Sequence, residues 1–242
     1  MKGWQIFIHS VRQVFGNFEA ALRVSGLLYL LQAALSVIFD LSILQDEAAM
    51  RAEIMAGTFN WAAVLLVLVV SVVTSLWIAV GWHRYVLLVE QAGLLPPFRG
   101  ELMLKYFGKS LAVGVIVLVI ASVAGFVAGM LYPPLAPMVT MLVALMIGNR
   151  LSVILPGSAV GKPTSLSEGW AATSGDNGTF LALSVIMLVV FSVIQLPAVY
   201  ILNSVPLLAF IWSLGTGWLF LMISISIITT LYGHYIEKRA LV

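Results

Sequence analysis

Residues 59–82 read FNWAAVLLVLVVSVVTSLWIAVGW, a run of 24 residues without a charged side chain. A helix needs roughly 20 mostly apolar residues to cross a hydrocarbon core about 30 Å thick. This segment therefore predicts a membrane-spanning helix. Five more stretches indicate the same, which predicts an all-α polytopic membrane protein with six spans, near residues 24–44, 59–82, 110–131, 138–155, 180–202 and 207–232.

The composition of the whole chain agrees with this. Of 242 residues, 62% are hydrophobic and 9% are charged, whereas soluble domains have about 45–50% apolar and about 25% charged residues. These proportions exclude a soluble domain, a disordered chain and a nucleic-acid-binding module. The chain has no cysteine and only three histidines, so we expect neither a disulfide nor a thiolate or histidine metal site, and no cofactor.

The basic residues indicate an orientation, because Lys and Arg collect in cytoplasmic loops. With the N-terminus in the cytoplasm, eleven of the twelve basic residues lie inside and only Arg51 lies outside. The outer segment 40–57 instead carries four acidic residues, Asp40, Asp46, Glu47 and Glu53. We therefore predict that both termini are cytoplasmic.

The N-terminal residues 1–22 do not have the pattern of a cleaved signal peptide. Apolar residues recur there at spacings of three and four, at Trp4, Phe7, Ile8, Val11, Val14, Phe15 and Phe18. The opposite face holds polar residues, namely His9, Ser10, Arg12, Gln13 and Asn17. The pattern predicts an amphipathic helix in the inner leaflet; the alternative is a helix packed under the bundle.

The sequence also resembles itself at a shift of 67 residues. This shift places five residues on identical ones: Gly81 on Gly148, Leu88 on Leu155, Pro96 on Pro163, Glu101 on Glu168, and Gly108 on Gly175. Short interfacial helices are expected at 98–107 and 165–174, each ended by a left-handed glycine, as is the N-terminal helix at Gly16. The prediction is a unit of one interfacial helix and one transmembrane hairpin, present as three parallel repeats.

Few polar residues lie inside the predicted spans, and no Asp, Glu, Lys or Arg lies near a span centre. This argues against an ion-coupled transporter. Gln32 and Gln195 could line a polar cavity, or each could make an ordinary hydrogen bond between helices. Ala121, Gly125 and Gly129 form a small-residue stripe that favours close helix packing, with a partner in the same chain or in another copy.

Arg150 lies about twelve residues into the fourth span, with the apolar run 151–155 behind it. One interpretation is that its side chain extends to lipid phosphates at the interface. The other is that it enters the bundle and pairs with a carboxylate, for which Glu168 and Glu101 are the candidates.

The residues around Arg150 resemble a known pattern. It consists of Arg150-Leu151-Ser152, Leu155-Pro156, Ala159-Val160-Gly161, Ser165-Leu166, Trp170, Thr173 and Gly175. It is similar to that of the YciC-like group of bacterial multi-pass membrane proteins and of the membrane domains attached to glycerophosphodiester phosphodiesterases. The resemblance implies a protein of the bacterial inner membrane; it carries over no catalytic residue.

Three functions remain open. The first is a non-catalytic scaffold, assembly factor or accessory subunit, whose partners are lipids and other membrane proteins or a second copy. The second is a carrier or channel for a small or lipid-like substrate. The third is a lipid-modifying enzyme at the cytoplasmic interface, which would need catalytic groups among His83, Glu101, Glu168 and Asp176. The candidate polar or lipid-contacting residues are Arg150, Gln32, Gln195, Glu168, His83 and Arg84.

Overall fold

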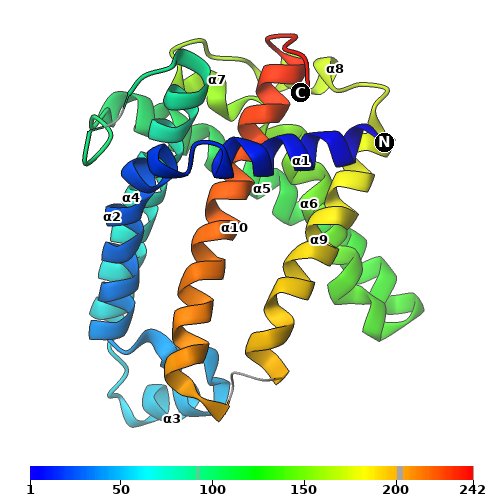
Figure 1. Ribbon diagram of the computed structural model, residues 1–242. Coiled ribbons are helices and arrows are strands. Elements are labelled where there is room, and N and C mark those ends of the chain that lie inside the picture. The colour runs from blue at the N-terminus through cyan, green and yellow to red at the C-terminus, as the bar shows by residue number, and fades with distance from the viewer. Residues whose placement is uncertain (92, 201–203, 242) are drawn as a thin grey trace.

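The computed structural model describes residues 1–91, 93–200 and 204–241, and in this part of the chain every regular element is a helix (Figure 1). The elements are α1 (Lys2–Phe15), α2 (Phe18–Ile38), η1 (Leu41–Gln45), α3 (Glu47–Ala56), α4 (Trp61–Leu88), α5 (Gly100–Leu131), η2 (Pro133–Leu135), α6 (Ala136–Ser152), α7 (Leu155–Ala159), α8 (Leu166–Ala172), α9 (Asn177–Tyr200) and α10 (Pro206–Tyr235).

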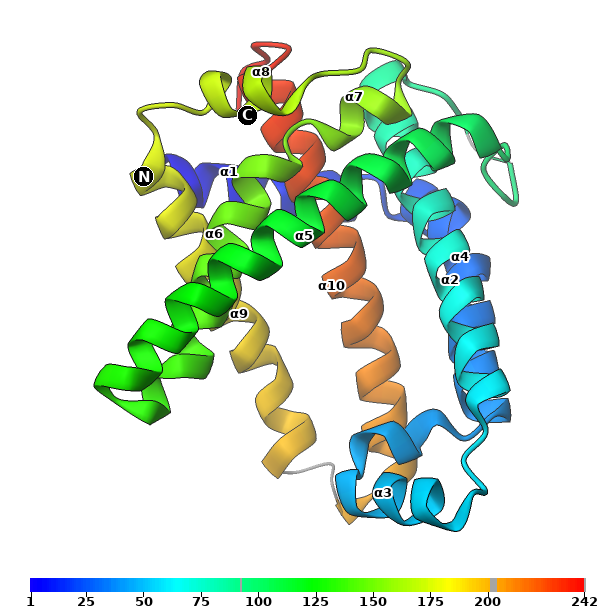
Figure 2. The same cartoon turned by 180° about the vertical axis from the view of Figure 1, so that it is seen from behind.

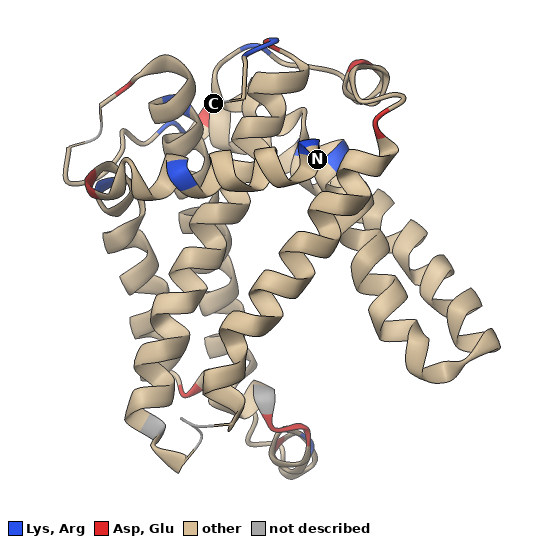
Figure 3. Ribbon diagram, turned by 45° about the vertical axis from the view of Figure 1, so that its right-hand side comes forward, with Lys and Arg blue, Asp and Glu red and all other residues tan. Residues whose placement is uncertain are grey.

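Six helices in the described part are long and apolar enough to cross a membrane, which confirms the number of candidate spans. They are α2, α4, α5, α6 together with η2, α9 and α10. Both termini lie at one end of the molecule, called here the N/C end, and α3 lies at the other (Figure 1). Charged residues gather at these two ends and leave the middles of the six long apolar helices free of charge among the described residues (Figure 3).

The first predicted span had the wrong bounds. The helix α2 begins at Phe18, six residues before the predicted start, and ends at Ile38. Its first turns include Glu19 and Arg23, which pair with each other one turn apart at the surface. Because this pair is neutral overall, the helix can begin in a polar stretch. The predicted end of the fifth span at Leu202 lies outside the described residues.

The three predicted left-handed glycines have different outcomes. Gly175 has the expected left-handed conformation with φ +83°, but α8 ends before it, at Ala172, with Thr173 as its C-cap. Gly16 lies in the right-handed region with φ −70°, although the chain does turn there between α1 and α2. Gly108 lies inside the continuous 32-residue helix α5, so the separate helix predicted at 98–107 is wrong. The short helix predicted at 165–174 is present as α8.

The length of α5 explains the error at 98–107. A 32-residue helix is about 48 Å long, and α5 slants across the molecule, so that its first turns remain at the N/C end (Figure 2). An ion pair between Glu101 and Lys105 lies on the surface of these turns. A tilted helix thus carries both the polar stretch and the apolar span without a break.

The helix α1 lies across α9 and α10 at the N/C end (Figure 1). Its buried face is formed by Gly3, Ile6, Phe7, Ser10 and Val14. The assignment of Ser10 to a polar outer face was wrong, since Ser10 is fully buried and hydrogen bonds to Thr230 of α10 at 3.0 Å. The predicted alternative, packing against the bundle, therefore describes this face. Trp4 and Phe15 remain about half exposed on another face.

Hydrogen bonds from aromatic side chains join α10 to its neighbours. Trp82 of α4 donates to Ser226 at 2.7 Å, and Trp218 of α10 donates to Ser25 of α2 at 2.8 Å. Tyr29 of α2 donates to the carbonyl of Leu214 at 3.0 Å. In a bilayer the hydrophobic effect does not drive helices together, so such bonds and close packing hold a bundle.

The small-residue stripe packs within the same chain, which decides between the two predicted partners. Ala121 and Gly125 are buried and Gly129 is half-buried, and both glycines face Ala136 of α6. A Cβ atom at Gly125 would overlap the hydroxyl oxygen of Thr140 and lie 3.3 Å from the carbonyl oxygen of Ala136. The two helices approach closely because residue 125 has no side chain.

The bundle is packed at the N/C end and open toward the α3 end. Buried side chains of α9 end at Met187, and those described on α10 begin at Thr216. Toward the α3 end, the α5–α6 pair leans away from α9 and α10 (Figures 2 and 3). The polar residues described next therefore lie almost all in the packed half.

Candidate functional site

Gln32 joins two spans. Its amide nitrogen donates to Thr74 Oγ1 at 2.6 Å and to Ser75 Oγ at 3.2 Å, both on α4. This is the hydrogen bond between helices that the sequence allowed as an alternative to a cavity. Neither Gln32 nor Gln195 lines any of five cavities that lie among the described residues. Gln195 lies half-buried on α9.

Arg150 is buried and only 6% exposed, so it enters the bundle as the second interpretation predicted, but its partners are not carboxylates. Its guanidinium donates to Thr173 Oγ1 at 3.1 Å and to Asn177 Oδ1 at 2.6 Å. It also lies 3.6 Å from the ring centroid of Trp170. The charge thus faces two neutral acceptors and an aromatic ring, an arrangement that holds a cation without a carboxylate.

The partners of Arg150 come from two other elements. Trp170 belongs to α8, Thr173 is the first residue after α8, and Asn177 is the first residue of α9. The predicted carboxylate partners are used elsewhere: Glu101 pairs with Lys105, and Glu168 accepts from the backbone and hydroxyl of Ser165 in a capping box that begins α8. Arg150 therefore ties α6 to the segment between α8 and α9.

His83 is fully buried at the centre of a hydrogen-bonded chain. Its Nδ1 lies 2.8 Å from Thr229 Oγ1 of α10, and its Nε2 lies 3.1 Å from the Tyr106 hydroxyl of α5. The Thr229 hydroxyl donates its hydrogen to the carbonyl of Ile225. Nδ1–H must therefore donate to Thr229, and the Tyr106 hydroxyl donates to Nε2. A neutral His83 thus links α4, α5 and α10.

Arg84 lies next to His83 but takes part in an ion-pair cluster at the N/C end. It donates to Glu90 Oε2 at 2.8 Å and to the carbonyl of Ala159 at 3.0 Å, while Arg99 donates to Glu90 Oε1 at 2.7 Å. Burial alone would raise the pKa of Glu90, but the hydrogen bonds from Arg84 and Arg99 outweigh it and lower that pKa. These contacts connect α4 to α7 and to the start of α5.

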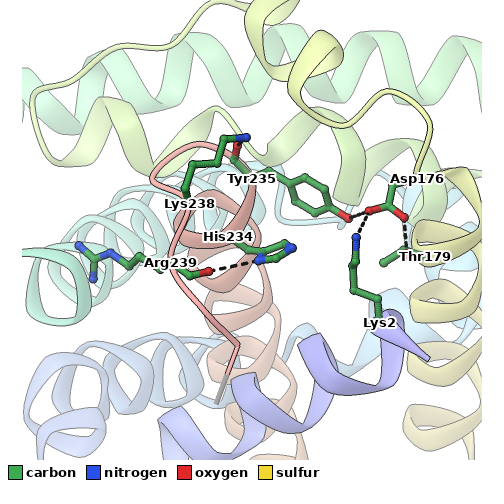
Figure 4. A network of polar contacts seen from close by, with 7 residues as sticks. All are labelled: Lys2, Asp176, Thr179, His234, Tyr235, Lys238 and Arg239. Carbon is green, nitrogen blue, oxygen red and sulfur yellow. Dashed lines mark hydrogen bonds and ion pairs between the residues drawn. The ribbon is translucent and has the colours of Figure 1, made fainter.

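Asp176 is held by three elements that meet at the N/C end (Figure 4). Lys2 of α1 pairs with its Oδ2 at 2.5 Å, Tyr235 of α10 donates to the same oxygen at 2.7 Å, and Thr179 of α9 donates to Oδ1 at 2.9 Å. The hydrogen bond from Lys2 is the largest cause that lowers the pKa of Asp176 to about 2; those from Tyr235 and Thr179 act in the same direction, against partial burial.

We predict that the contact between Lys2 and Asp176 makes the free energy of unfolding depend on pH. The pKa of Asp176 lies below the 3.8 of a free carboxyl, so its ionised form stabilises the folded protein above about pH 4 and stops doing so as the pH falls through about 2. Because Lys2 is 41% exposed, we expect only about 1 kcal/mol. Thermal unfolding in detergent at pH 5, 4, 3 and 2 measures this effect.

The variant Asp176→Asn is the matched control, because it keeps the shape of the side chain and cannot ionise. Over the same pH range its stability should fall by about 1 kcal/mol less than that of the parent protein. Parallel pH profiles for the two proteins would contradict the prediction. Other carboxylates, Glu90 among them, titrate equally in both proteins and cancel in the difference.

The four residues among which a lipid-modifying enzyme would find its catalytic groups do not come together. His83 contacts Tyr106 and Thr229, Asp176 contacts Lys2 and Tyr235, and the two glutamates lie at the surface with the partners named above. No group of three or more His, Cys, Asp or Glu in the described part of the chain could hold a metal ion.

The sequence analysis did not identify the residues that contact His83 and Arg150 in the folded chain. Tyr106, Thr229, Trp170 and Asn177 are polar or aromatic residues near span ends, and nothing in their spacing connects them to His83 or Arg150. The contacts with His83 join residues 23 and 146 positions away. Only the packing of the helices brings them together.

No protein-family model matches the chain, and neither a curated protein nor a solved structure matches it. The resemblance to the YciC-like group therefore stays a prediction.

Proposed function

We propose that this protein is a non-catalytic multi-pass membrane protein that acts as a scaffold, assembly factor or accessory subunit of a larger membrane complex. The observation that carries the proposal is the open half of the bundle. Near the α3 end, every residue of the stretch 207–213 on α10 except Ala209 is exposed, and together these residues cover most of the circumference of the helix. A spanning helix that packs so little within its own chain favours a partner helix beside it.

The polar residues of the packed half support the same function. His83, Arg150, Gln32 and Asp176 each bind neighbouring helices of the same chain. Their geometry holds the six spans and α1 in one arrangement at the N/C end. A rigid half joined to an open apolar half is suited to presenting helices to another membrane protein.

The carrier or channel remains the second candidate, and fewer observations favour it. A polar path across the membrane would need a series of polar or ionisable groups between the helices, and the sequence places no Asp, Glu, Lys or Arg near a span centre. Gln32, one of the candidates from the sequence, is bonded to Thr74 and Ser75.

A site-specific crosslinking experiment tests the scaffold. Because the chain contains no cysteine, a single cysteine carries a photoreactive benzophenone to one chosen position. We expect Val193→Cys on α9 and Phe210→Cys on α10 to yield a protein adduct of discrete mass after illumination of intact membranes. The matched control is Leu27→Cys on α2, which is 58% exposed, close to the 56% of Val193.

The control position should label mainly lipid, and the mass of the adducts at 193 and 210 identifies the partner; twice the mass of the chain would indicate a second copy. The scaffold proposal fails if 193 and 210 give no protein adduct. It also fails if Leu27→Cys gives the same adducts with the same yield, since random collisions would then explain all three.

We propose further that the N/C end faces the cytoplasm of a bacterial cell, with the protein in the inner membrane. Eleven of the twelve basic residues support this orientation. The three spanning pairs, α2–α4, α5–α6 and α9–α10, would be parallel repeats of one unit. Each pair is in contact in the folded chain, and α8 precedes the third pair as α1 precedes the first.

The orientation leads to a direct prediction. In intact cells with a permeable outer barrier, a membrane-impermeant maleimide should label Arg51→Cys on α3 and leave Lys162→Cys unlabelled. Both side chains are well exposed, at 72% and 67%, so burial does not separate them. After detergent lysis both should react equally. Labelling of residue 162 in intact cells would reverse the proposed orientation.

A further inference from the structure

A groove of about 430 Å³ lies between three of the spanning helices. Its walls are formed by α4, with Ser71, Ser75 and Ala79, by α5, with Tyr106 and Ser110, and by α10. This volume falls within the range of about 300–1,000 Å³ typical of small-molecule sites. All three walls belong to candidate membrane spans, so a molecule dissolved in the bilayer can reach the groove from the side.

The walls of the groove are held in place by the chain around His83. His83 belongs to α4, Tyr106 to α5 and Thr229 to α10, so one run of hydrogen bonds joins the three helices that form the groove. Tyr106 itself lines the groove. Since each helix is fixed to the next, the groove is formed before any ligand enters, which reduces the entropy lost on binding.

Two serine hydroxyls give the groove a chemical preference. Ser71 and Ser75 are one turn apart on α4, so both lie on the same wall. Ser75 Oγ accepts from Gln32 at 3.2 Å. Among the described residues neither hydroxyl donates to an acceptor, whereas the neighbouring Thr74 donates to the carbonyl of Val70. A hydroxyl without an acceptor is costly in an apolar setting, so an acceptor oxygen on a ligand would be favoured here.

We propose that this groove binds a single-chain amphiphile from the bilayer, with its apolar chain along α5 and α10 and a hydroxyl or carbonyl oxygen at Ser71 and Ser75. The site does not depend on the scaffold function, since it uses the packed half of the bundle. Its ligand class follows from an apolar groove that holds two hydrogen-bond donors on one wall.

Native mass spectrometry of the full chain, released from a short polyether detergent, tests this proposal with two probes. The first probe is oleyl alcohol, and the second is a hydrocarbon of equal chain length, octadecene. We expect oleyl alcohol to saturate at one molecule per chain and to bind at least fivefold more tightly than octadecene. Two hydrogen bonds each worth about 0.5–1.5 kcal/mol in proteins account for a difference of this size.

The double variant Ser71→Ala/Ser75→Ala should weaken oleyl alcohol binding about fivefold to tenfold and leave octadecene binding unchanged. The substitution at residue 71 breaks no hydrogen bond of the Ser71 hydroxyl within the described chain. The substitution at residue 75 removes the bond from Gln32 to Ser75, but Gln32 keeps its shorter bond to Thr74. The matched control is Ser122→Ala on the exposed surface of α5, which should bind as the parent does. Ser110→Phe should fill the groove and abolish saturable binding of both probes.

The proposal is wrong if oleyl alcohol adducts grow without saturation, because this indicates partition into the detergent belt. It is also wrong if the double serine variant binds oleyl alcohol as tightly as Ser122→Ala does. If Ser110→Phe does not fold, the serine comparison alone decides the question. A crosslinking result against the scaffold leaves this test unaffected.

Discussion

Arg150→Ala is expected to lower the free energy of unfolding in detergent by about 2–3 kcal/mol. The substitution removes hydrogen bonds from a charged donor to Thr173 and Asn177, each worth about 1.5–3 kcal/mol before desolvation is regained. It also removes the stacking on Trp170, worth about 1–2 kcal/mol. Thermal unfolding followed by tryptophan fluorescence measures the loss, and Trp170 itself should become more accessible to quenchers.

Two further variants test whether the planar guanidinium of Arg150 matters beyond its charge. One replaces it by lysine, and the other is a control at an exposed arginine. Arg150→Lys keeps the charge but cannot reach both acceptors in the planar geometry of a guanidinium, so it should recover less than half of the loss. Arg23→Ala removes an arginine that is 53% exposed and pairs with Glu19 on its own helix, and it should cost less than 0.5 kcal/mol. If Arg150→Ala is as stable as Arg23→Ala, the role assigned to Arg150 is wrong.

Gly125→Leu should have an effect of similar or greater size, about 3 kcal/mol, because it separates two helices. Already the Cβ atom would overlap Thr140 Oγ1, which is hydrogen bonded to the carbonyl of Ala136 and cannot move aside freely. Overpacking of a close helix contact usually costs about 1–3 kcal/mol, and here the remaining leucine atoms have no space at all. Resistance of the folded fraction to heating and to SDS measures this loss.

Gly114→Leu is the matched control on the same helix. A Cβ atom at Gly114 meets nothing within 4 Å, and leucine favours a helix by about 0.8 kcal/mol relative to glycine. We therefore expect Gly114→Leu to be as stable as the parent protein or slightly more stable. Equal stability of the two leucine variants would show that α5 and α6 do not meet through Gly125.

The two variants also bear on the proposed function. Gly125→Leu disturbs the α5–α6 pair where it leans away from α9 and α10, in the open half of the bundle, while Arg150→Ala disturbs the packed half. If a partner binds the open half, Gly125→Leu should reduce the crosslinked adduct at Phe210→Cys more than Arg150→Ala does. The comparison is made on the folded fraction of each variant.

The sequence by itself determined that the fold is all-helical and that six helices are long and apolar enough to span a membrane. Apolar runs of about 20 residues are sufficient to predict spanning helices, because backbone groups in lipid have to bond within their own helix. Residues 59–82 show this clearly, and the stripe at Gly125 predicted close packing correctly. The capped short helix at 165–174 was also predicted, since the glycine that follows it is local information.

The tertiary structure alone decided what the polar residues contact. Arg150 was expected at lipid phosphates or at a carboxylate, and it lies instead between Thr173, Asn177 and Trp170. Ser10 was expected on an outer face, yet it packs on Thr230. The physical reason is that hydropathy measures how favourably a residue is transferred from water into lipid. It contains no information on which helix will pack beside that residue. In a bilayer, neighbours are chosen by side-chain fit and by hydrogen bonds between residues far apart in the chain, and only the folded chain brings those residues together.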